Sequence, residues 1–167
     1  MKKKNKKVKE PEKKLPRILN LGCGNIHLPK EEGWINIDMD KTCNPDVVRN
    51  LEKGLPFDTN SVEGLYSANT IEHISDIFFF MYEIWRVCKP NVVVEIIAPL
   101  YDHPNAIWPN HVRYIRPNYF YMWIPKKRLG TMVMNYETET MGAEFETISE
   151  SIINEGTAIR FFLQVVK

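Results

Sequence analysis

The chain has 167 residues, enough for one domain that buries roughly two thirds of the surface exposed by its unfolded form. Hydrophobic residues make up 44% and charged residues 26%, as in an ordinary folded protein, which excludes a disordered or disulfide-dependent chain. The longest apolar stretch, between Val92 and Leu100, is far shorter than the roughly 20 residues of a membrane-spanning helix.

The three cysteines predict neither disulfides nor a metal site. Cys23, Cys43 and Cys88 lack the C-x-x-C spacing of zinc and redox sites, so we expect no metal. The amino terminus has no apolar core of the secretory kind. Both observations favour a cytoplasmic protein in a reducing compartment.

The first 14 residues differ in charge from the rest of the chain. Eight lysines against Glu10 and Glu12 give a local balance of +6 within a net charge of +1, which leaves the body at −5. Such a run is typical of a solvated, disordered extension, although it could also bind nucleic acid or anionic lipid. We therefore predict a disordered basic tail over residues 1–16 and a single domain over 17–167.

Strands and helices are predicted to alternate along this domain. The expected strands are residues 17–21, 34–38, 46–51, 64–69 and 92–98, with a closing hairpin of 144–149 and 158–166. Helices are expected at about 75–88 and, after Pro117, at 118–123, whereas residues 25–33 are too few for a long crossover helix. The alternation is typical of a doubly wound α/β sheet.

Burial is also predicted for two of these elements. The helix at 75–88 is expected to bury one face, marked at helical spacing by Ile74, Phe78, Met81 or Tyr82, Trp85 and Cys88. The nearly continuous apolar run at 92–98 predicts a central parallel strand that is covered on both faces.

A nucleoside site is predicted where the first two strands end. The turn Gly22-Cys23-Gly24 follows the first strand, and Asp38 ends the second. Glycines let the backbone approach a ligand, and a carboxylate can accept hydrogen bonds from two ribose hydroxyls. A dinucleotide fingerprint would continue with a third small residue opening a long helix, where this chain has His27. The pattern therefore disfavours NAD.

Over about residues 17 to 124, the chain resembles the compact class I methyltransferases of the type 11 kind. The segments that carry the resemblance are LNLGCGN (19–25), GWINID (33–38), PDVVRNLEKGLPF (45–57), SANTIEHI (67–74), VCKPN (87–91) and HVRYIRPNYF (111–120). The resemblance implies a Rossmann-like seven-stranded sheet of order 3-2-1-4-5-7-6 with an antiparallel last strand and a truncated first crossover helix. It also implies S-adenosylmethionine as the cofactor.

The resemblance assigns cofactor contacts to the ends of the first four strands. The glycine loop would hold the methionine portion, Asp38 the ribose hydroxyls, and Asn50 the adenine amino group in place of the family's usual acid. The backbone amide of the next residue would face the adenine ring, and the fourth strand end would lie near the sulfonium. The predicted cofactor-binding residues are Asn20, Gly22, Cys23, Gly24, Asp38, Asn50, Leu51 and Asn69.

Catalysis by such an enzyme needs few fixed groups. Methyl transfer from a sulfonium depends mainly on positioning the acceptor and excluding water, and a histidine suits removal of an acceptor's proton at neutral pH. Each candidate histidine could instead order its own loop by hydrogen bonds. The candidates are His103, His73 and His111 for catalysis, and Tyr101, Asp102 and Arg113 for acceptor binding.

The function implied is methyl transfer to a small-molecule acceptor, with an oxygen of a sugar or glycan precursor favoured by family analogy. One alternative is an RNA or other nucleic-acid methyltransferase, because of the lysine-rich tail. DNA enzymes are disfavoured, since residues 67–70 read Ser-Ala-Asn-Thr where amino-group DNA enzymes carry a Pro-Pro motif, and the chain has no Pro-Cys pair. The other alternative is a catalytically inactive partner or sensor that binds S-adenosylmethionine, which Asn20 and Asn50 in place of acids would allow. Family analogy alone favours oxygen over nitrogen as the accepting atom, and the residues favour neither a monomer nor a dimer.

Overall fold

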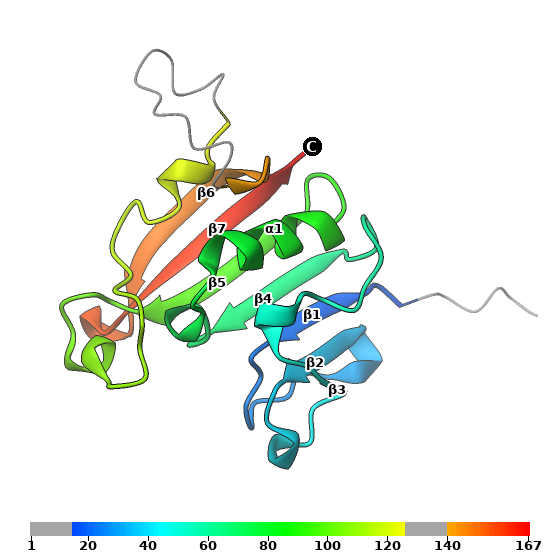
Figure 1. Cartoon of the computed structure of the whole chain (residues 1–167), viewed down its shortest axis with the longest axis horizontal. Helices are drawn as coiled ribbons and strands as arrows, with labels where there is room; N and C mark the ends of the chain where they lie inside the picture. The colour runs from blue at the N-terminus through cyan, green and yellow to red at the C-terminus, as the bar shows by residue number, and fades with distance from the viewer. Residues whose placement is uncertain (1–14, 126–139) are drawn as a thin grey trace, which may run out of the picture.

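The computed structural model describes residues 15–125 and 140–167. Its centre is a seven-stranded sheet in the order β3-β2-β1-β4-β5-β7-β6 (Figure 1). The five strands β1 to β5 run parallel, β7 is antiparallel to β5, and β6 is antiparallel to β7. The predicted strand order is therefore confirmed. The strands are β1 Ile18–Leu21, β2 Trp34–Asp38, β3 Val47–Val48, β4 Gly64–Ala68, β5 Val93–Pro99, β6 Glu144–Ile153 and β7 Ala158–Val166.

The main helix, α1 (Ile77–Val87), lies within the predicted range of 75–88. It begins after Asp76, whose side chain accepts a hydrogen bond from the backbone amide of Phe79, an N-cap that satisfies one otherwise unpaired donor. It ends at Val87 with Cys88 as its C-cap, ahead of Pro90, which cannot continue a helix.

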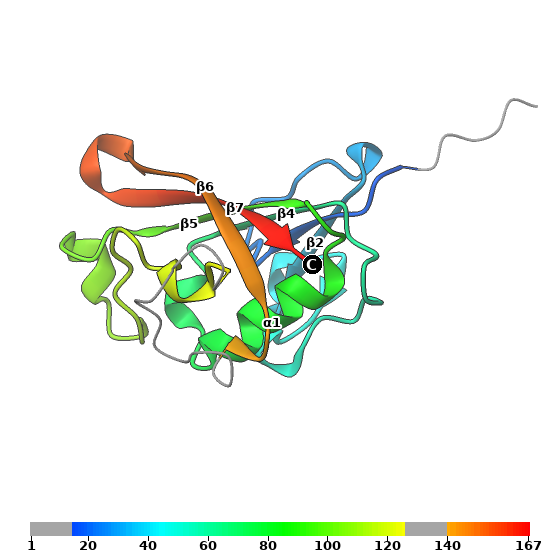
Figure 2. The ribbon, with the colours of Figure 1, turned by 90° about the horizontal axis from the view of Figure 1, so that it is seen from above.

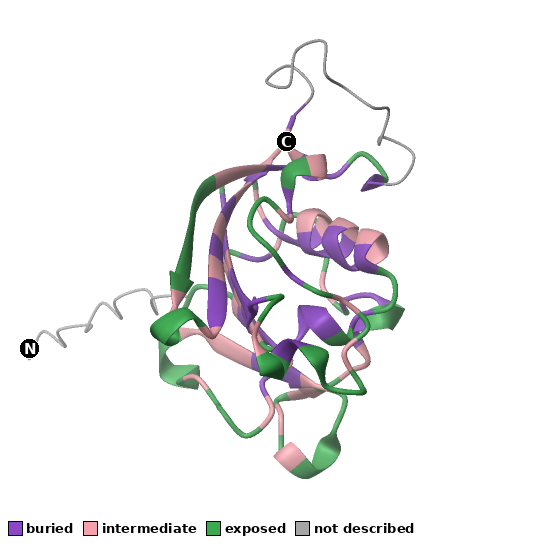
Figure 3. Cartoon of the chain, turned by 90° about the vertical axis from the view of Figure 1, so that its left-hand side faces the viewer, coloured by how far each residue is buried: buried purple, intermediate pink, exposed green. Residues whose placement is uncertain are grey.

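The core lies between α1 and the sheet, both of which carry many buried residues (Figure 3). The predicted buried face of the helix is confirmed in part. Ile74, Met81 and Cys88 are buried, whereas Phe78, Tyr82 and Trp85 are only partly buried. Trp85 reaches the end of the sheet, where its indole N–H donates to the carbonyl of Val166 at 2.7 Å. The helix residues that are buried are Ile77, Phe80, Met81, Glu83, Ile84 and Val87.

The crossovers between β1, β2, β3 and β4 are short. Single 3-10 turns occupy them, including η1 (Lys30–Glu32) between β1 and β2, so the predicted truncation of the first crossover helix is confirmed. Such turns cover little of the sheet, and α1 packs on one face of it (Figure 2). The expectation that 92–98 is covered on both faces was wrong, because Val93 is 43% exposed and Glu95 is partly exposed.

Three other predicted boundaries differ from the structure. β3 has two residues instead of six, because Asn50 caps the 3-10 turn η3 (Leu51–Lys53) and turns the chain away. The helix expected at 118–123 is reduced to η6 (Tyr121–Trp123), since Asn118 has a φ of 61° and interrupts a right-handed helix. β6 extends four residues beyond the predicted 144–149, with a register shift between Thr147 and Ser149.

The lysine-rich segment 1–14 lies outside the described residues, so the disorder of residues 1–16 stays a prediction. Across residues 15–125 and 140–167, no helix combines the length and hydropathy that crossing a membrane requires.

Candidate active site

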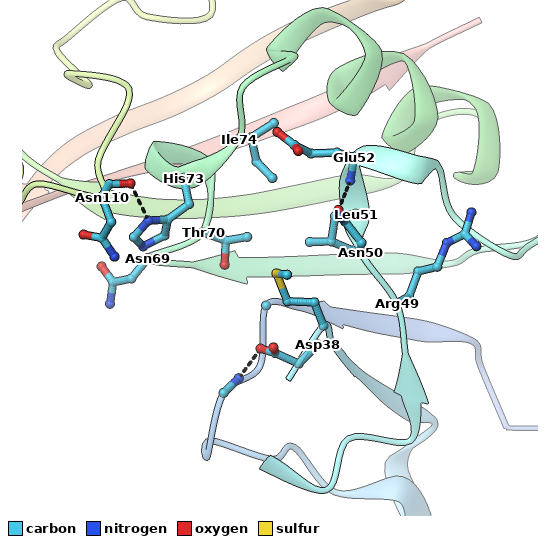
Figure 4. A pocket seen from close by; sticks show the side chains of 13 residues that line it. Asp38, Arg49, Asn50, Leu51, Glu52, Asn69, Thr70, His73, Ile74 and Asn110 are labelled. Carbon is cyan, nitrogen blue, oxygen red and sulfur yellow. Dashed lines mark hydrogen bonds between the residues drawn. The ribbon is translucent and has the colours of Figure 1, made fainter. Parts of the chain in front are cut away.

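A pocket of about 580 Å³ opens at the carboxyl ends of β1, β2 and β4, the edge where parallel sheets bind ligands (Figure 4). It brings together seven of the residues predicted from the sequence. These are Gly22, Gly24, Asp38, Asn50, Leu51, Asn69 and His73. Its other lining residues are Met39, Arg49, Glu52, Thr70, Ile74 and Asn110.

The glycine loop after β1 requires glycine at its first position for two reasons. Gly22 has a φ of +66°, a backbone angle that residues with a side chain rarely adopt. A Cβ atom added at this position would lie 2.1 Å from Oγ1 of Thr70. Gly24 also has a positive φ, +48°, but a Cβ atom there would meet no described atom within 4 Å. The loop therefore presents bare backbone to the pocket, as a closely bound ligand would need.

Asp38 joins the glycine loop to the end of β2. Its Oδ2 accepts a hydrogen bond from the amide of Gly24 at 2.8 Å, and its Oδ1 accepts one from the amide of Asp40 at 2.9 Å. A carboxylate has about four acceptor positions, so each oxygen can accept one more hydrogen bond. The partly exposed Asp38 can therefore hold the loop and still bind two hydroxyl groups of a ligand.

Asn50 and Leu51 form a third part of the pocket wall. The side-chain oxygen of Asn50 accepts a hydrogen bond from the amide of Glu52 at 2.9 Å, and Leu51 is 7% exposed. Met39 lines the same pocket and is 68% exposed, so its apolar side chain is available to a ligand.

Asn20 and Cys23 are absent from the pocket lining. Asn20 is 2% exposed, and its side-chain amide donates to the carbonyl of Ile26 and to Oδ1 of Asn36, both at 2.9 Å. Cys23 is also buried, and burial, together with the nearby Asp38, raises the pKa of its thiol to about 11. Both residues therefore stabilise the glycine loop without lining the pocket.

Two of the three candidate histidines meet beside the pocket. The rings of His73 and His111 lie edge to face, with their centroids 4.7 Å apart. Nδ1 of His73 is 3.2 Å from the carbonyl of Asn110, and Nδ1 of His111 is 3.2 Å from the carbonyl of Ala106. Beside them Glu72 is buried, and desolvation raises the pKa of its carboxyl group.

Of the residues predicted for catalysis and acceptor binding, His73 lines this pocket and the others do not. His103 caps the 3-10 turn η5 (Pro104–Ile107), with its Nδ1 accepting a hydrogen bond from the amide of Asn105 at 3.2 Å. Tyr101 and Asp102 are exposed, and the guanidinium of Arg116 lies 5.2 Å from the ring centroid of Tyr101.

Arg113 is engaged with backbone. Its Nε donates to the carbonyl of Ile74 at 2.6 Å, and its Nη2 donates to the carbonyl of Ser75. It therefore joins the loop that carries His111 to the segment that carries His73.

Residues 19–96 match the family model described as a methyltransferase domain. This segment is a methyltransferase domain. It contains the glycine loop, Asp38, Asn50 and the Glu72-His73 pair. The sequence-based identification as a class I methyltransferase of the type 11 kind is thus confirmed, and S-adenosylmethionine is the cofactor of that family.

Solved structures share the fold of this methyltransferase domain. A SAM-dependent methyltransferase from Aquifex aeolicus is 18% identical, with a TM-score of 0.61 over 92% of this chain and 85% of that one. A complex between a methyltransferase activator of Haloferax volcanii and a methyltransferase matches at 14% identity and a TM-score of 0.58, over 91% and 84%. The cyclase SpnF matches at 10% identity and a TM-score of 0.65, over 91% and 75%. A search among curated proteins gave no match.

Sequence reasoning missed several residues that line the pocket. Thr70 follows the predicted strand directly, and its contact with Gly22 was not foreseeable because it joins two different strand ends. Asn110 comes from a distant loop, and no local pattern marks it. Met39 was detectable in principle, since it directly follows Asp38 at a strand end.

Proposed function

We propose that this methyltransferase domain binds S-adenosylmethionine in the pocket at the ends of β1, β2 and β4 and transfers its methyl group to a small-molecule acceptor. The arrangement of the Gly22 to Gly24 loop against Asp38 carries this proposal. The cavity of about 580 Å³ also falls within the roughly 300 to 1,000 Å³ of small-molecule sites.

Each part of the pocket suits one part of the cofactor. The remaining lone pairs of Asp38 suit the two ribose hydroxyls, and the bare backbone at Gly22 and Gly24 suits the methionine portion. The exposed Met39 and the capped turn at Asn50 suit the adenine ring and its amino group. The residues present therefore fit this cofactor.

S-adenosylmethionine, when bound, supplies a methyl group activated by the attached sulfonium. The protein has to hold the acceptor in line with that methyl group and keep water out. His73 is the candidate histidine that lines the pocket. Since a carbonyl only accepts, the contact of its Nδ1 with Asn110 leaves the lone pair on Nε2, which can accept a hydrogen bond from an acceptor hydroxyl.

An oxygen of a sugar or glycan precursor is the acceptor that we favour. Family analogy supports this choice. The loop that carries Asn110 also exposes the aromatic residues Trp108 and Tyr114, at 59% and 54%, and such side chains pair an apolar face with a polar group. The cytoplasmic location and any contact of the lysine-rich tail with nucleic acid stay predictions.

The test is formation of S-adenosylhomocysteine by the full chain with two acceptor panels, one of sugars and sugar nucleotides and one of RNA. Turnover on the sugar panel supports the proposal. Turnover confined to the RNA panel would contradict the small-molecule acceptor and support a nucleic-acid acceptor in its place. Binding of S-adenosylmethionine without turnover on either panel favours a sensor. Absence of binding contradicts the proposal as a whole.

A further inference from the structure

We propose that Glu72, His73 and His111 bind a divalent transition-metal ion at the side of the pocket. One ligand atom from each residue lies within 4.8 Å of the others. Ligands about 2.1 Å from a tetrahedral ion are about 3.4 Å apart, so side-chain movements of about an ångström would complete the site. His73 also lines the pocket, which connects the site to the acceptor side.

Glu72 supplies the first argument. It is 2% exposed, and among the described residues neither of its carboxylate oxygens has a hydrogen-bond partner. A buried carboxylate without a donor is costly, and such groups in native proteins call for an explanation. A bound cation would satisfy both oxygens and their charge.

The two histidines supply the second argument, which is independent of the first. Nδ1 of each ring faces a backbone carbonyl at 3.2 Å, that of Asn110 for His73 and that of Ala106 for His111. A carbonyl cannot donate, so Nδ1 carries the proton and Nε2 the lone pair. Metal-binding histidines show this arrangement, in which a hydrogen bond from one nitrogen orients the other toward the ion.

The two segments that carry these ligands are held together without an ion. The amide of Val112 donates to the carbonyl of Glu72 at 2.8 Å, and Arg113 donates to the carbonyls of Ile74 and Ser75. The site is therefore largely formed in advance. The sequence predicted no metal because that prediction rested on the spacing of the cysteines, whereas these ligands are a glutamate and two histidines from segments far apart in the chain.

The ligand set indicates which ions fit. Two imidazoles and one carboxylate are typical of catalytic Zn²⁺ and non-haem Fe²⁺ sites, which keep positions open for substrate, whereas Mg²⁺ prefers oxygen ligands. In the metal-bound state Nε2 of His73 would bind the ion, and an acceptor hydroxyl would occupy an open position. This catalytic role rests on the proposed function, whereas metal binding itself does not.

The ion would activate the acceptor oxygen. A bound cation lowers the pKa of a coordinated hydroxyl, so the O–H bond breaks and its proton leaves to water. The new O–CH₃ bond then forms as the S–CH₃ bond breaks, and that electron pair stays on sulfur. No oxidant or reductant is needed.

The test uses the full chain, stripped of metal with a chelator and titrated with Co²⁺ and Zn²⁺. We expect one Co²⁺ per chain, with visible absorption of a low-symmetry site, and displacement by Zn²⁺. His111→Ala should weaken binding about 100-fold or more, beyond the effect typical of losing an outer-shell partner. The matched control is His27→Ala, which removes an exposed histidine before β2 and should bind Co²⁺ like the parent chain.

Glu72→Gln is a second variant, which separates loss of metal binding from loss of folding. Without metal its melting temperature should equal or exceed that of the parent chain, because an unpaired buried carboxyl has been replaced, but the rise caused by Zn²⁺ should be lost. Absence of Co²⁺ binding, or equal binding by His111→Ala, overturns the proposal. Titration with S-adenosylmethionine in the metal-free protein is the separate readout for the proposed function.

Discussion

Replacing Gly22 with alanine should destabilise the domain more than any other change in the glycine loop. The new Cβ atom would lie 2.1 Å from Oγ1 and 2.7 Å from Cγ2 of Thr70, which is 7% exposed and has little room to move. The left-handed backbone of Gly22 costs an alanine about 1 to 2 kcal/mol, and overpacking typically adds about 1 to 3 kcal/mol. The free energy of unfolding should fall by about 2 to 5 kcal/mol.

Gly24→Ala is the matched control for this substitution. Its φ is also positive, but the new Cβ atom would meet no described atom within 4 Å, so only the backbone cost of about 1 to 2 kcal/mol applies. Urea unfolding followed by tryptophan fluorescence measures both variants. Thr70→Ala should recover part of the loss in Gly22→Ala but none in Gly24→Ala, because it removes the two nearest clashing atoms. Equal losses for the two glycines, or no recovery, would refute the reasoning.

Three further predictions concern stability and reactivity. Glu83→Gln should lower the free energy of unfolding at pH 7 by about 1.5 to 3 kcal/mol, because the hydrogen bond from Arg86 lowers the pKa of this carboxyl group below its usual 4.5. A lowered pKa stabilises the fold above pH 4.5, so the difference from the parent should shrink as pH falls below that value. Cys88 should resist iodoacetamide at pH 8 in the folded chain, since burial raises the pKa of its thiol to about 12. Arg113→Ala should lower the free energy of unfolding by about 1 to 3 kcal/mol, because it frees two backbone carbonyls.

Each of these predictions has its own control. Urea denaturation across pH 3 to 8 measures Glu83→Gln, and a difference that stays constant through pH 4 would contradict the pKa argument. For Cys88, mass spectrometry should find complete labelling in urea, and fast labelling of the folded chain would contradict its burial. For Arg113, lysine at the same position is the control, and a stability unchanged by alanine would show that the two hydrogen bonds carry little energy.

The part of the fold around β1, β2 and β4 was predictable because local patterns determine it. Each strand is a short apolar run that ends at a glycine or a polar residue, and α1 begins after a capping Asp76 and ends before Pro90. The buried face of α1 was predictable only in part, because the aromatic residues Phe78 and Trp85 reach across the edge of the core and stay partly exposed. The length of β6 was equally hidden, since its far half pairs with β7 while its side chains stay exposed.

The candidate site likewise contains some residues that local patterns predict and others that depend on contacts between distant segments. Gly22, Gly24 and Asp38 stand at strand ends, and parallel strands bring their carboxyl ends to one edge. Asn20 was expected at the cofactor, but its position opposite Asn36 in the parallel register gives its side chain a partner in the next strand. The meeting of His73 with the loop at 106–113 depends on backbone hydrogen bonds between distant segments, which no spacing reveals.

Calorimetric titration of the full chain and of Asp38→Asn with S-adenosylmethionine tests the central claim most directly. The account predicts one cofactor per parent chain. It predicts affinity about 10- to 100-fold lower for Asp38→Asn, since hydrogen bonds to a charged group are worth about 1.5 to 3 kcal/mol. The melting temperature of Asp38→Asn should fall slightly, because an asparagine can accept only one of the two hydrogen bonds from the amides of Gly24 and Asp40. Absence of binding by the parent chain, or equal affinity for the two proteins, would contradict it.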